Sequence, residues 1–132
     1  MMPVSASGLL APYREAAGRG VLLLPCCGDC GTWHWPPRAA CRRCGGTLDW
    51  RQAGGGGRLS TWSVVTRAPR PELQADVPYV VAFVELDEGV RLFTRIVGTD
   101  AGALRAGQRV RCRFDASPDS TVSIPVFVVA EG

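Results

Sequence analysis

The chain has 132 residues, of which 46% are hydrophobic, and its 15 basic and 12 acidic residues give a formal net charge of +3. This length fits one ordinary domain, or a small unit joined to a compact barrel. No stretch approaches the ~20 apolar residues of a membrane span, and so small a charge is weak support for a nucleic-acid surface.

The N-terminal segment, residues 1–20, is expected to be helical. From about residue 9 to residue 19 the apolar side chains lie roughly on one side of a helix, which Gly18 and Gly20 end. The segment has no long apolar core and carries both charge signs, so it does not resemble a secretory signal peptide. We expect a cytoplasmic protein, because the Cys-x-x-Cys pairs that follow point to a reducing compartment.

Two Cys-x-x-Cys-Gly pairs follow, Cys27 with Cys30 and Cys41 with Cys44. A tetrahedral zinc ion takes four thiolates at roughly 2.3 Å, and a two-residue gap lets both sulfurs of a pair reach one metal. The glycine after each second cysteine can take the left-handed conformation of a tight knuckle. Four cysteines close the coordination shell, whereas a catalytic zinc keeps one position open. The sequence therefore predicts one structural Zn²⁺ per chain, in a zinc ribbon over residues 21–53.

Other interpretations of these residues stay open at this point. A disulfide framework would suit a secreted chain, but six cysteines in 132 residues is below the density of a disulfide scaffold. A thioredoxin-like redox site needs one Cys-x-x-Cys at a strand-to-helix junction, and this chain has two. His34 could replace one cysteine as a ligand. Cys26 breaks the spacing and is expected to be a spare thiol, and Cys112 a small core residue.

Four glycines at positions 54–57 mark the end of the ribbon. Such a run is typical of a flexible hinge between small units. We therefore expect a further unit over residues 54–132.

Strand signals dominate this last unit. The turn Asp87-Glu88-Gly89 lies between two strand patterns, which predicts a β-hairpin. From Arg109 to Phe114 arginines alternate strictly with apolar residues. Five strands fit an OB-fold barrel and make the fold mainly β. The expected strands are residues 59–66, 79–86, 90–97, 109–114 and 124–129.

The sequence shows no complete catalytic apparatus. Nucleophilic catalysis needs a base within hydrogen-bond reach of a nucleophile, and His34 is the single histidine. Glu85, Asp87 and Glu88 straddle the hairpin turn, where carboxylates are ordinary solvated groups rather than an acid–base pair. The glycines at 54–57 lack the Lys-Ser/Thr that completes a phosphate loop. We expect that the chain is not itself an enzyme.

A longer set of motifs extends beyond the cysteines. It comprises residues 24–31, 36–38, 41–45, 50, 59–65, 78–81, 84–92, 107–110 and 125–127. With this set the chain resembles the acyl-CoA-associated zinc-ribbon/OB-fold proteins, a family long catalogued only as a domain of unknown function. It departs from their pattern at Cys26, where a basic or polar residue is usual, and at Arg42-Arg43, where proline often comes first.

The resemblance implies an N-terminal helix and a rubredoxin-like ribbon joined to an OB barrel. Family members act as partners of thiolase-fold proteins, namely acyltransferases, thiolases, hydroxymethylglutaryl-CoA synthases and steroid side-chain aldolases. Others are attached to hot-dog-fold enoyl-CoA hydratases. The domain scaffolds these assemblies and can help hold the CoA thioester, while the partner supplies the nucleophile and bases.

Arginines are the residues expected to meet the phosphates of CoA, because the guanidinium fork matches phosphate oxygens bidentately. Arg67 flanks a proline-rich loop, while Arg91 and Arg95 share one strand face. These three are the candidate CoA contacts, although a solvated barrel face would display arginines equally.

The predicted function is a non-catalytic accessory subunit that binds a thiolase-fold or hot-dog-fold acyl-CoA enzyme. The alternative is a nucleic-acid-binding zinc-ribbon/OB module, because OB grooves also bind nucleic acids. That alternative requires aromatic residues displayed on the barrel for base stacking and an affinity that falls steeply with salt. A third possibility is a small acyltransferase or hydrolase in its own right.

Overall fold

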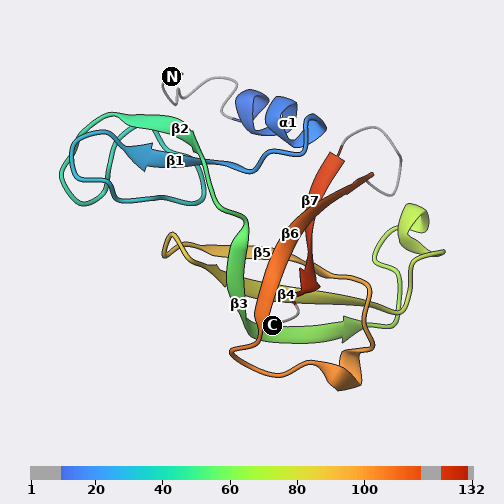
Figure 1. Cartoon of the computed structure of the whole chain (residues 1–132). Coiled ribbons are helices and arrows are strands. Elements are labelled where there is room, and N and C mark those ends of the chain that lie inside the picture. The colour runs from blue at the N-terminus through green and yellow to red at the C-terminus, as the bar shows by residue number, and fades with distance from the viewer. Residues whose placement is uncertain (1–9, 117–122, 131–132) are drawn as a thin grey trace.

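The computed structural model describes residues 10–116 and 123–130, and it is mainly β with one α-helix, as predicted (Figure 1). The N-terminal half holds a helix and a two-stranded sheet, and the rest forms a closed barrel. The elements are α1 Ala11–Gly18, β1 Leu23–Cys27, β2 Leu48–Gln52, β3 Gly56–Val65, η1 Pro71–Leu73, β4 Tyr79–Leu86, β5 Arg91–Ile96, η2 Ala101–Ala103, β6 Arg109–Ala116 and β7 Ser123–Val129.

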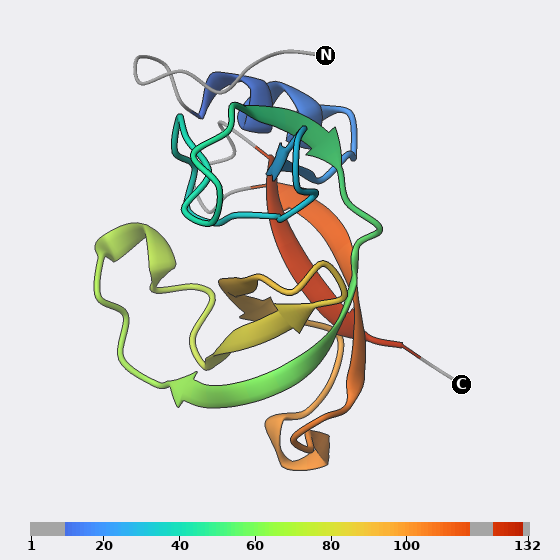
Figure 2. The ribbon, with the colours of Figure 1, turned by 90° about the vertical axis from the view of Figure 1, so that its left-hand side faces the viewer.

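The barrel closes in the strand order β3-β4-β5-β7-β6, with β6 pairing back onto β3. Every pairing is antiparallel except the short parallel contact between β5 and β7. Figure 2 shows β3 curving from β6 round to β4, and its register shifts between Leu59 and Thr61. Such a bulge bends a strand enough to serve two neighbours. This is the predicted five-stranded OB barrel.

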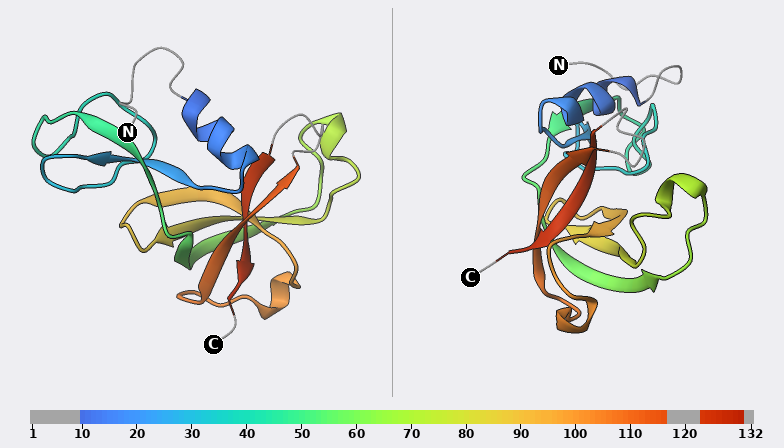
Figure 3. Two further views of the ribbon diagram at one scale, coloured as in Figure 1. Left: turned by 45° about the horizontal axis from the view of Figure 1, so that its top comes forward. Right: turned by 90° about the vertical axis from the view of Figure 1, so that its right-hand side faces the viewer.

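Helix α1 is shorter than predicted and covers the junction between ribbon and barrel. It lies against β1 and β7 (Figure 3). The ring centroid of its Tyr13 is 5.0 Å from that of Trp35 and 6.5 Å from that of Trp50. Burial raises the pKa of Tyr13 to about 12, with a smaller contribution from Cys112. Gly20 ends the turn at φ +75°. Among the described residues no helix is long and apolar enough to cross a membrane.

The ribbon and the barrel share one hydrophobic core. Leu22, Leu24 and Ala53 from the ribbon segment pack in the same cluster as the barrel residues Leu59 and Phe127. A second, smaller cluster lies around the cysteines and contains Cys27, Cys41, Leu48 and Trp50. The segments proposed with boundaries at residues 20 and 53 are therefore distinct in sequence, but side chains on both sides of the boundary at residue 53 pack in one core.

The glycine run is not the flexible hinge that the sequence predicted. Gly56 and Gly57 are the first two residues of β3, and Gly57 is buried. A Cβ at Gly57 would lie 2.6 Å from a backbone oxygen of β4. The hairpin turn closes over the run, because Asp87 N donates to the Gly56 oxygen at 3.0 Å and Gly54 N donates to Glu88 Oε2 at 2.8 Å. The glycines allow close approach of backbone to backbone.

Candidate metal centre and basic cleft

The four cysteines of the two pairs lie together at the tip of the ribbon. Cys27 ends β1 and Cys30 lies in the turn after it, while Cys41 and Cys44 lie in the turn that precedes β2. Their Sγ atoms all lie within 4.8 Å of one another. The Cys27–Cys44 sulfurs are 3.5 Å apart and the Cys30–Cys41 sulfurs 3.6 Å. The structure thus brings all four predicted ligands to one point.

The two knuckles repeat one backbone design. Gly31 N donates to the Cys27 oxygen at 3.0 Å, and Gly45 N donates to the Cys41 oxygen at the same distance. Both glycines take positive φ, +74° and +77°, as their position after the second cysteine predicted. A backbone N–H also points at one sulfur of each pair: Cys30 N at Cys27 Sγ, 3.5 Å, and Arg43 N at Cys41 Sγ, 3.3 Å.

This donor set fits zinc. Four sulfurs around a tetrahedral Zn²⁺ at roughly 2.3 Å would lie about 3.8 Å from one another, close to the separations of the two nearest pairs. Cys27 and Cys41 are buried, while Cys30 and Cys44 are exposed. All four positions of the shell are protein sulfurs, as in structural sites. Bound there, the ion would join the two turns of the ribbon.

The thiols differ in how readily they ionise. A hydrogen bond to the Thr32 side chain is the main reason that the pKa of Cys30 falls to about 6. A hydrogen bond from the backbone N–H of Gly46 lowers the pKa of Cys44. The hydrogen bonds of the Cys44 thiol with Cys27 and Cys30 outweigh that effect and raise its pKa to about 12. Crowded thiolates repel one another, and a divalent cation removes that repulsion.

His34 lies outside the four-sulfur group but contacts it. It is buried, and its Nε2 is 3.3 Å from Cys41 Sγ. Its pKa is lowered by burial and then by the charges of Arg38 and Arg42. The sequence left open that His34 replaces one of the cysteines as a ligand. The structure gives it a specific neighbour, the sulfur of a predicted ligand.

The two remaining cysteines are shielded. Cys26 is buried, with its Sγ 3.6 Å from the Gly31 oxygen. Burial is the main cause of the raised pKa of Cys26, and it raises that of half-buried Cys112 to about 12. Cys112 packs against the barrel core, as predicted.

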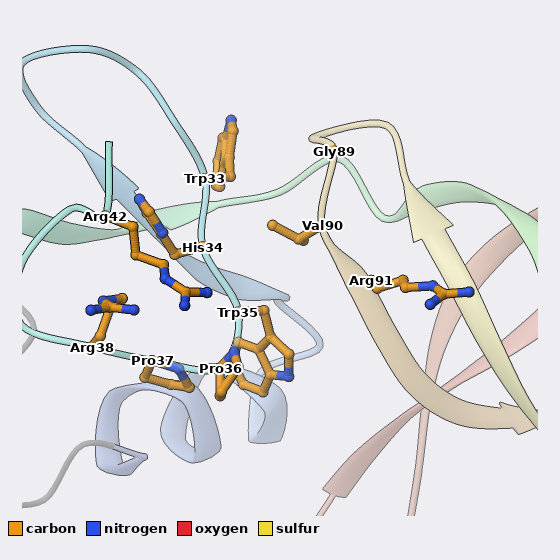
Figure 4. Close-up of a pocket in the computed structure, with 10 residues that line it drawn as sticks. All are labelled: Trp33, His34, Trp35, Pro36, Pro37, Arg38, Arg42, Gly89, Val90 and Arg91. Atoms are coloured by element: carbon orange, nitrogen blue, oxygen red, sulfur yellow. The ribbon is translucent and has the colours of Figure 1, made fainter. Parts of the chain in front are cut away.

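A cleft of about 520 Å³ separates the ribbon loop from the β4–β5 hairpin (Figure 4). The ribbon contributes residues 33–38 and Arg42, and the hairpin contributes residues 89–91. In Figure 4 the side chains of Trp33 and Trp35 stand on opposite sides of the opening, and the guanidinium group of Arg42 points between them. The lining therefore combines indole rings with arginines.

The three arginines proposed from the sequence do not form one site. Arg91 lines the cleft with its stem, but its guanidinium points away, to Ser60 Oγ at 3.2 Å and over the Phe83 ring at 4.9 Å. Arg95 lines a different, smaller hollow beside β4 and β5. Arg67 is exposed in the loop after β3 and lines neither hollow.

The guanidinium group of Arg95 already has partners within the chain. Its guanidinium lies 3.9 Å from the Tyr79 ring centroid and donates to Asp76 Oδ2 at 3.2 Å. The arginines that sequence reasoning overlooked are Arg38 and Arg42 in the ribbon loops. Their signal was positional, since residues between and inside the two cysteine pairs must lie near the metal.

The hairpin carboxylates have structural partners. Asp87 accepts two hydrogen bonds from Arg109, at 2.7 and 3.0 Å, and Glu88 accepts from Gly54. The hydrogen bond from Arg109 is the main reason that the pKa of Asp87 is lowered. These contacts fasten the turn to the start of β3 and to β6.

Two aromatic rings are exposed on the outer face of β4 and β5. Phe83 and Phe93 are paired across the strands, 39% and 63% exposed, with ring centroids 5.1 Å apart. The alternation of β4 and β5 places both rings on the outside of the barrel, where the nucleic-acid alternative requires aromatic residues.

Comparison with protein families assigns both halves of the chain. Residues 14–51 match the family model described as the ChsH2 rubredoxin-like zinc ribbon domain, and residues 50–115 match that of the ChsH2 C-terminal OB-fold domain. The two matches overlap at residues 50–51, in β2 and just before the glycine run.

Curated relatives agree with this assignment. The chain is 37% identical over 90 residues to a DUF35 domain-containing scaffold protein of Methanothermobacter thermautotrophicus, covering 67% of each. It is 32% identical over 104 residues to one of Methanocaldococcus jannaschii, covering 77% of this chain and 73% of that protein. It is also 37% identical over 118 residues to the probable enoyl-CoA hydratase alpha subunit of Thermomonospora curvata. That match takes in 87% of this chain but 35% of the longer relative.

Solved structures extend the likeness to three dimensions. The fold matches a chain of the Ltp2-ChsH2(DUF35) aldolase with a TM-score of 0.81 and 34% identity, over 92% of this chain and 94% of that one. A DUF35 protein of unknown function from Sulfolobus solfataricus shares the fold at 11% identity and a TM-score of 0.57, over 91% of this chain and 84% of that one. The chain therefore belongs to the DUF35 family, which joins a ChsH2-type rubredoxin-like zinc ribbon to an OB-fold domain.

Proposed function

We propose that this chain is a non-catalytic accessory subunit of an acyl-CoA-processing enzyme, and that its partner has the thiolase fold. The observation that carries the proposal is the match to a chain of the Ltp2-ChsH2(DUF35) aldolase, at 34% identity over 92% of this chain. The scaffold-protein names of the two archaeal relatives support the accessory role. Aldolases are among the thiolase-fold partners that the sequence resemblance implied.

The chemistry of the side chains is consistent with this role. The cysteine cluster would hold a zinc ion in a closed shell, and such an ion stabilises the ribbon rather than activating a water. His34 is engaged with Cys41, and Asp87 and Glu88 are engaged at the hairpin. The nucleophile and bases would then belong to the partner.

The alternative partner is an enoyl-CoA hydratase of the hot-dog fold. The Thermomonospora curvata relative is named as a probable hydratase subunit, and this chain corresponds to about a third of it. In both versions the bound substrate would be a CoA thioester.

Co-purification tests the proposal. The tagged, zinc-loaded chain is expected to retain a thiolase-fold enzyme from its native extract, identified by mass spectrometry, and the purified pair is expected to re-form in one peak on size exclusion. A stable chain that recruits no acyl-CoA enzyme and turns over thioesters by itself would refute the proposal.

A second candidate function, nucleic-acid binding, is favoured by one observation. Phe83 and Phe93 are exposed on β4 and β5, beside Arg91, and these are the second and third strands of the barrel, the face on which OB folds bind oligonucleotides. It predicts low-salt binding of single-stranded oligonucleotides that Phe83→Ala with Phe93→Ala abolishes. Absence of any binding at low salt removes this candidate.

A further inference from the structure

The basic cleft between ribbon and hairpin has the features of a built ligand site. Its volume of about 520 Å³ lies within the ~300–1,000 Å³ typical of small-molecule pockets. It is formed by two segments about 50 residues apart in sequence, and none of the described residues that line it is an aspartate or a glutamate. The lining therefore selects for negative charge.

Two arginines, Arg38 and Arg42, supply the positive charge that attracts such a ligand. Arg38 donates its Nε to the Ala40 oxygen at 2.9 Å, which fixes the stem and leaves the terminal nitrogens directed elsewhere. Among the residues that the structure describes, neither Arg38 nor Arg42 forms an ion pair, whereas Arg95, Arg109 and Arg113 each do. Two unpaired guanidinium groups beside one opening match the oxygens of phosphate groups.

Two indole rings supply a surface for a planar group. Trp35 is held by the ring of Tyr13 at 5.0 Å, so its position is fixed from behind. Trp33 stands across the opening from it (Figure 4), and its backbone bridges to Cys26. Stacking of a base on such a ring is worth ~1–3 kcal/mol by alanine substitution in single-strand binding proteins.

We propose that this cleft binds a phosphorylated nucleotide, with Arg38 and Arg42 on the phosphates and a tryptophan ring against the base. The proposal deepens the proposed function and rests on it for the source of the nucleotide, which is the phosphorylated adenosine end of a CoA thioester. It also moves the CoA contacts from the barrel arginines Arg67, Arg91 and Arg95 to the ribbon.

The test is equilibrium binding of nucleotide probes to the full, zinc-loaded chain. Binding is measured by calorimetry and by the quenching of tryptophan fluorescence. The probes are CoA, adenosine 3′,5′-bisphosphate, dephospho-CoA and pantetheine. CoA and the bisphosphate are expected to bind with similar affinity, dephospho-CoA more weakly, and pantetheine not at all. Pantetheine lacks the nucleotide part of CoA, both its base and its phosphates. If pantetheine bound as tightly as CoA, the assignment of the cleft to a nucleotide would be overturned.

Paired variants locate the site. Arg38→Gln with Arg42→Gln is expected to weaken CoA binding at least tenfold. Arg105→Gln replaces an exposed arginine that follows η2 and does not line the cleft, and it is expected to leave CoA binding unchanged. Zinc content and circular dichroism establish that each variant is folded. If the double variant loses its zinc, Trp33→Phe replaces it as the test variant. Trp33→Phe is expected to weaken CoA binding and to reduce the quenching of tryptophan fluorescence by CoA. Unchanged CoA affinity in a folded double variant overturns the proposal.

The outcome is separable from that of the proposed function. If the chain forms its enzyme complex but neither the chain nor the complex shows an Arg38- and Arg42-dependent affinity for CoA, the cleft proposal fails and the accessory role stands. If the chain binds CoA in the cleft but recruits no acyl-CoA enzyme, the accessory role fails. A single-stranded oligonucleotide that binds the cleft more tightly than CoA would overturn the choice of CoA as the source.

Discussion

At the residue scale, the metal centre has an inner and an outer pair of sulfurs. Cys27 and Cys41 are buried beside Leu48 and Trp50, whereas Cys30 and Cys44 face solvent. The inner pair therefore links the metal to the small cluster that holds the ribbon together. Structural zinc supplies ~10 kcal/mol or more of folding free energy in small zinc domains.

We predict that Cys41→Ser removes bound zinc and the cooperative unfolding of the ribbon, because the remaining sulfurs cannot close the shell. Elemental analysis is expected to give one zinc per wild-type chain and far less in the variant. Cys112→Ala is the matched control and is expected to keep its zinc, since Cys112 lies in β6, away from the cluster. A Cys41→Ser protein with full zinc content and unchanged unfolding would contradict the prediction.

His34→Gln is predicted to retain one zinc per chain. Four sulfurs complete the shell, so the loss of the imidazole removes only a neighbour of Cys41. Its expected effect is a lower resistance to a chelator. A fall in stoichiometry to near zero in a folded variant would instead identify His34 as a ligand.

Sites formed by residues close together in the sequence could be predicted, whereas sites formed by distant residues could not. The cysteines could be predicted because a two-residue gap fixes sulfur positions locally. The cleft could not, since it needs Arg42 and Val90, almost 50 residues apart, to face each other across the shared core. The outward position of Phe83 also needed the structure, because strand alternation defines two faces without saying which one is buried.

At the scale of elements, the start of β3 and the β4–β5 hairpin form one unit. A composition of four glycines is compatible with a hinge or with close packing, and only the tertiary structure distinguishes them. Here the turn residues Asp87 and Glu88 bind the glycine backbone directly. A Cβ at Gly56 would lie 2.9 Å from both Asp87 Oδ2 and Arg109 Nη2.

A matched pair of substitutions separates packing from flexibility. Gly57→Ala is predicted to cost ~1–3 kcal/mol of unfolding free energy, because its Cβ would meet backbone of β4 at 2.6 Å. Gly54→Ala is predicted to change it by less than ~0.5 kcal/mol, since its Cβ would make an ordinary 3.5 Å contact. Denaturant unfolding measures both. Equal tolerance of the two alanines would restore the flexible hinge.

The Asp87–Arg109 pair is predicted to fasten the hairpin to β6. Asp87→Asn should lower the melting temperature slightly, and 1 M NaCl should shrink the difference from wild type, because salt screens an exposed ion pair. Arg113→Gln, which breaks a pair within one strand, is the control and is expected to have less effect. A difference that is unchanged by salt would mean that charge is not the cause.

At the scale of the whole molecule, the shared core makes ribbon, helix and barrel one rigid support for the cleft. The OB topology was predictable because its hairpin and its alternating strands are local signals. The packing of Leu22 and Leu24 into the barrel was not, since it depends on how two units meet. A zinc-fastened support with exposed aromatic and basic surfaces suits a subunit that assists another enzyme.

The central claim is that the chemistry belongs to a partner chain. Its most direct test is turnover of acyl-CoA thioesters by the isolated zinc-loaded chain, by the co-purified enzyme alone, and by the two reconstituted together. We predict no turnover by the chain, and higher turnover by the reconstituted pair than by the enzyme alone. Turnover by the isolated chain, or an enzyme whose rate is indifferent to it, would contradict the account.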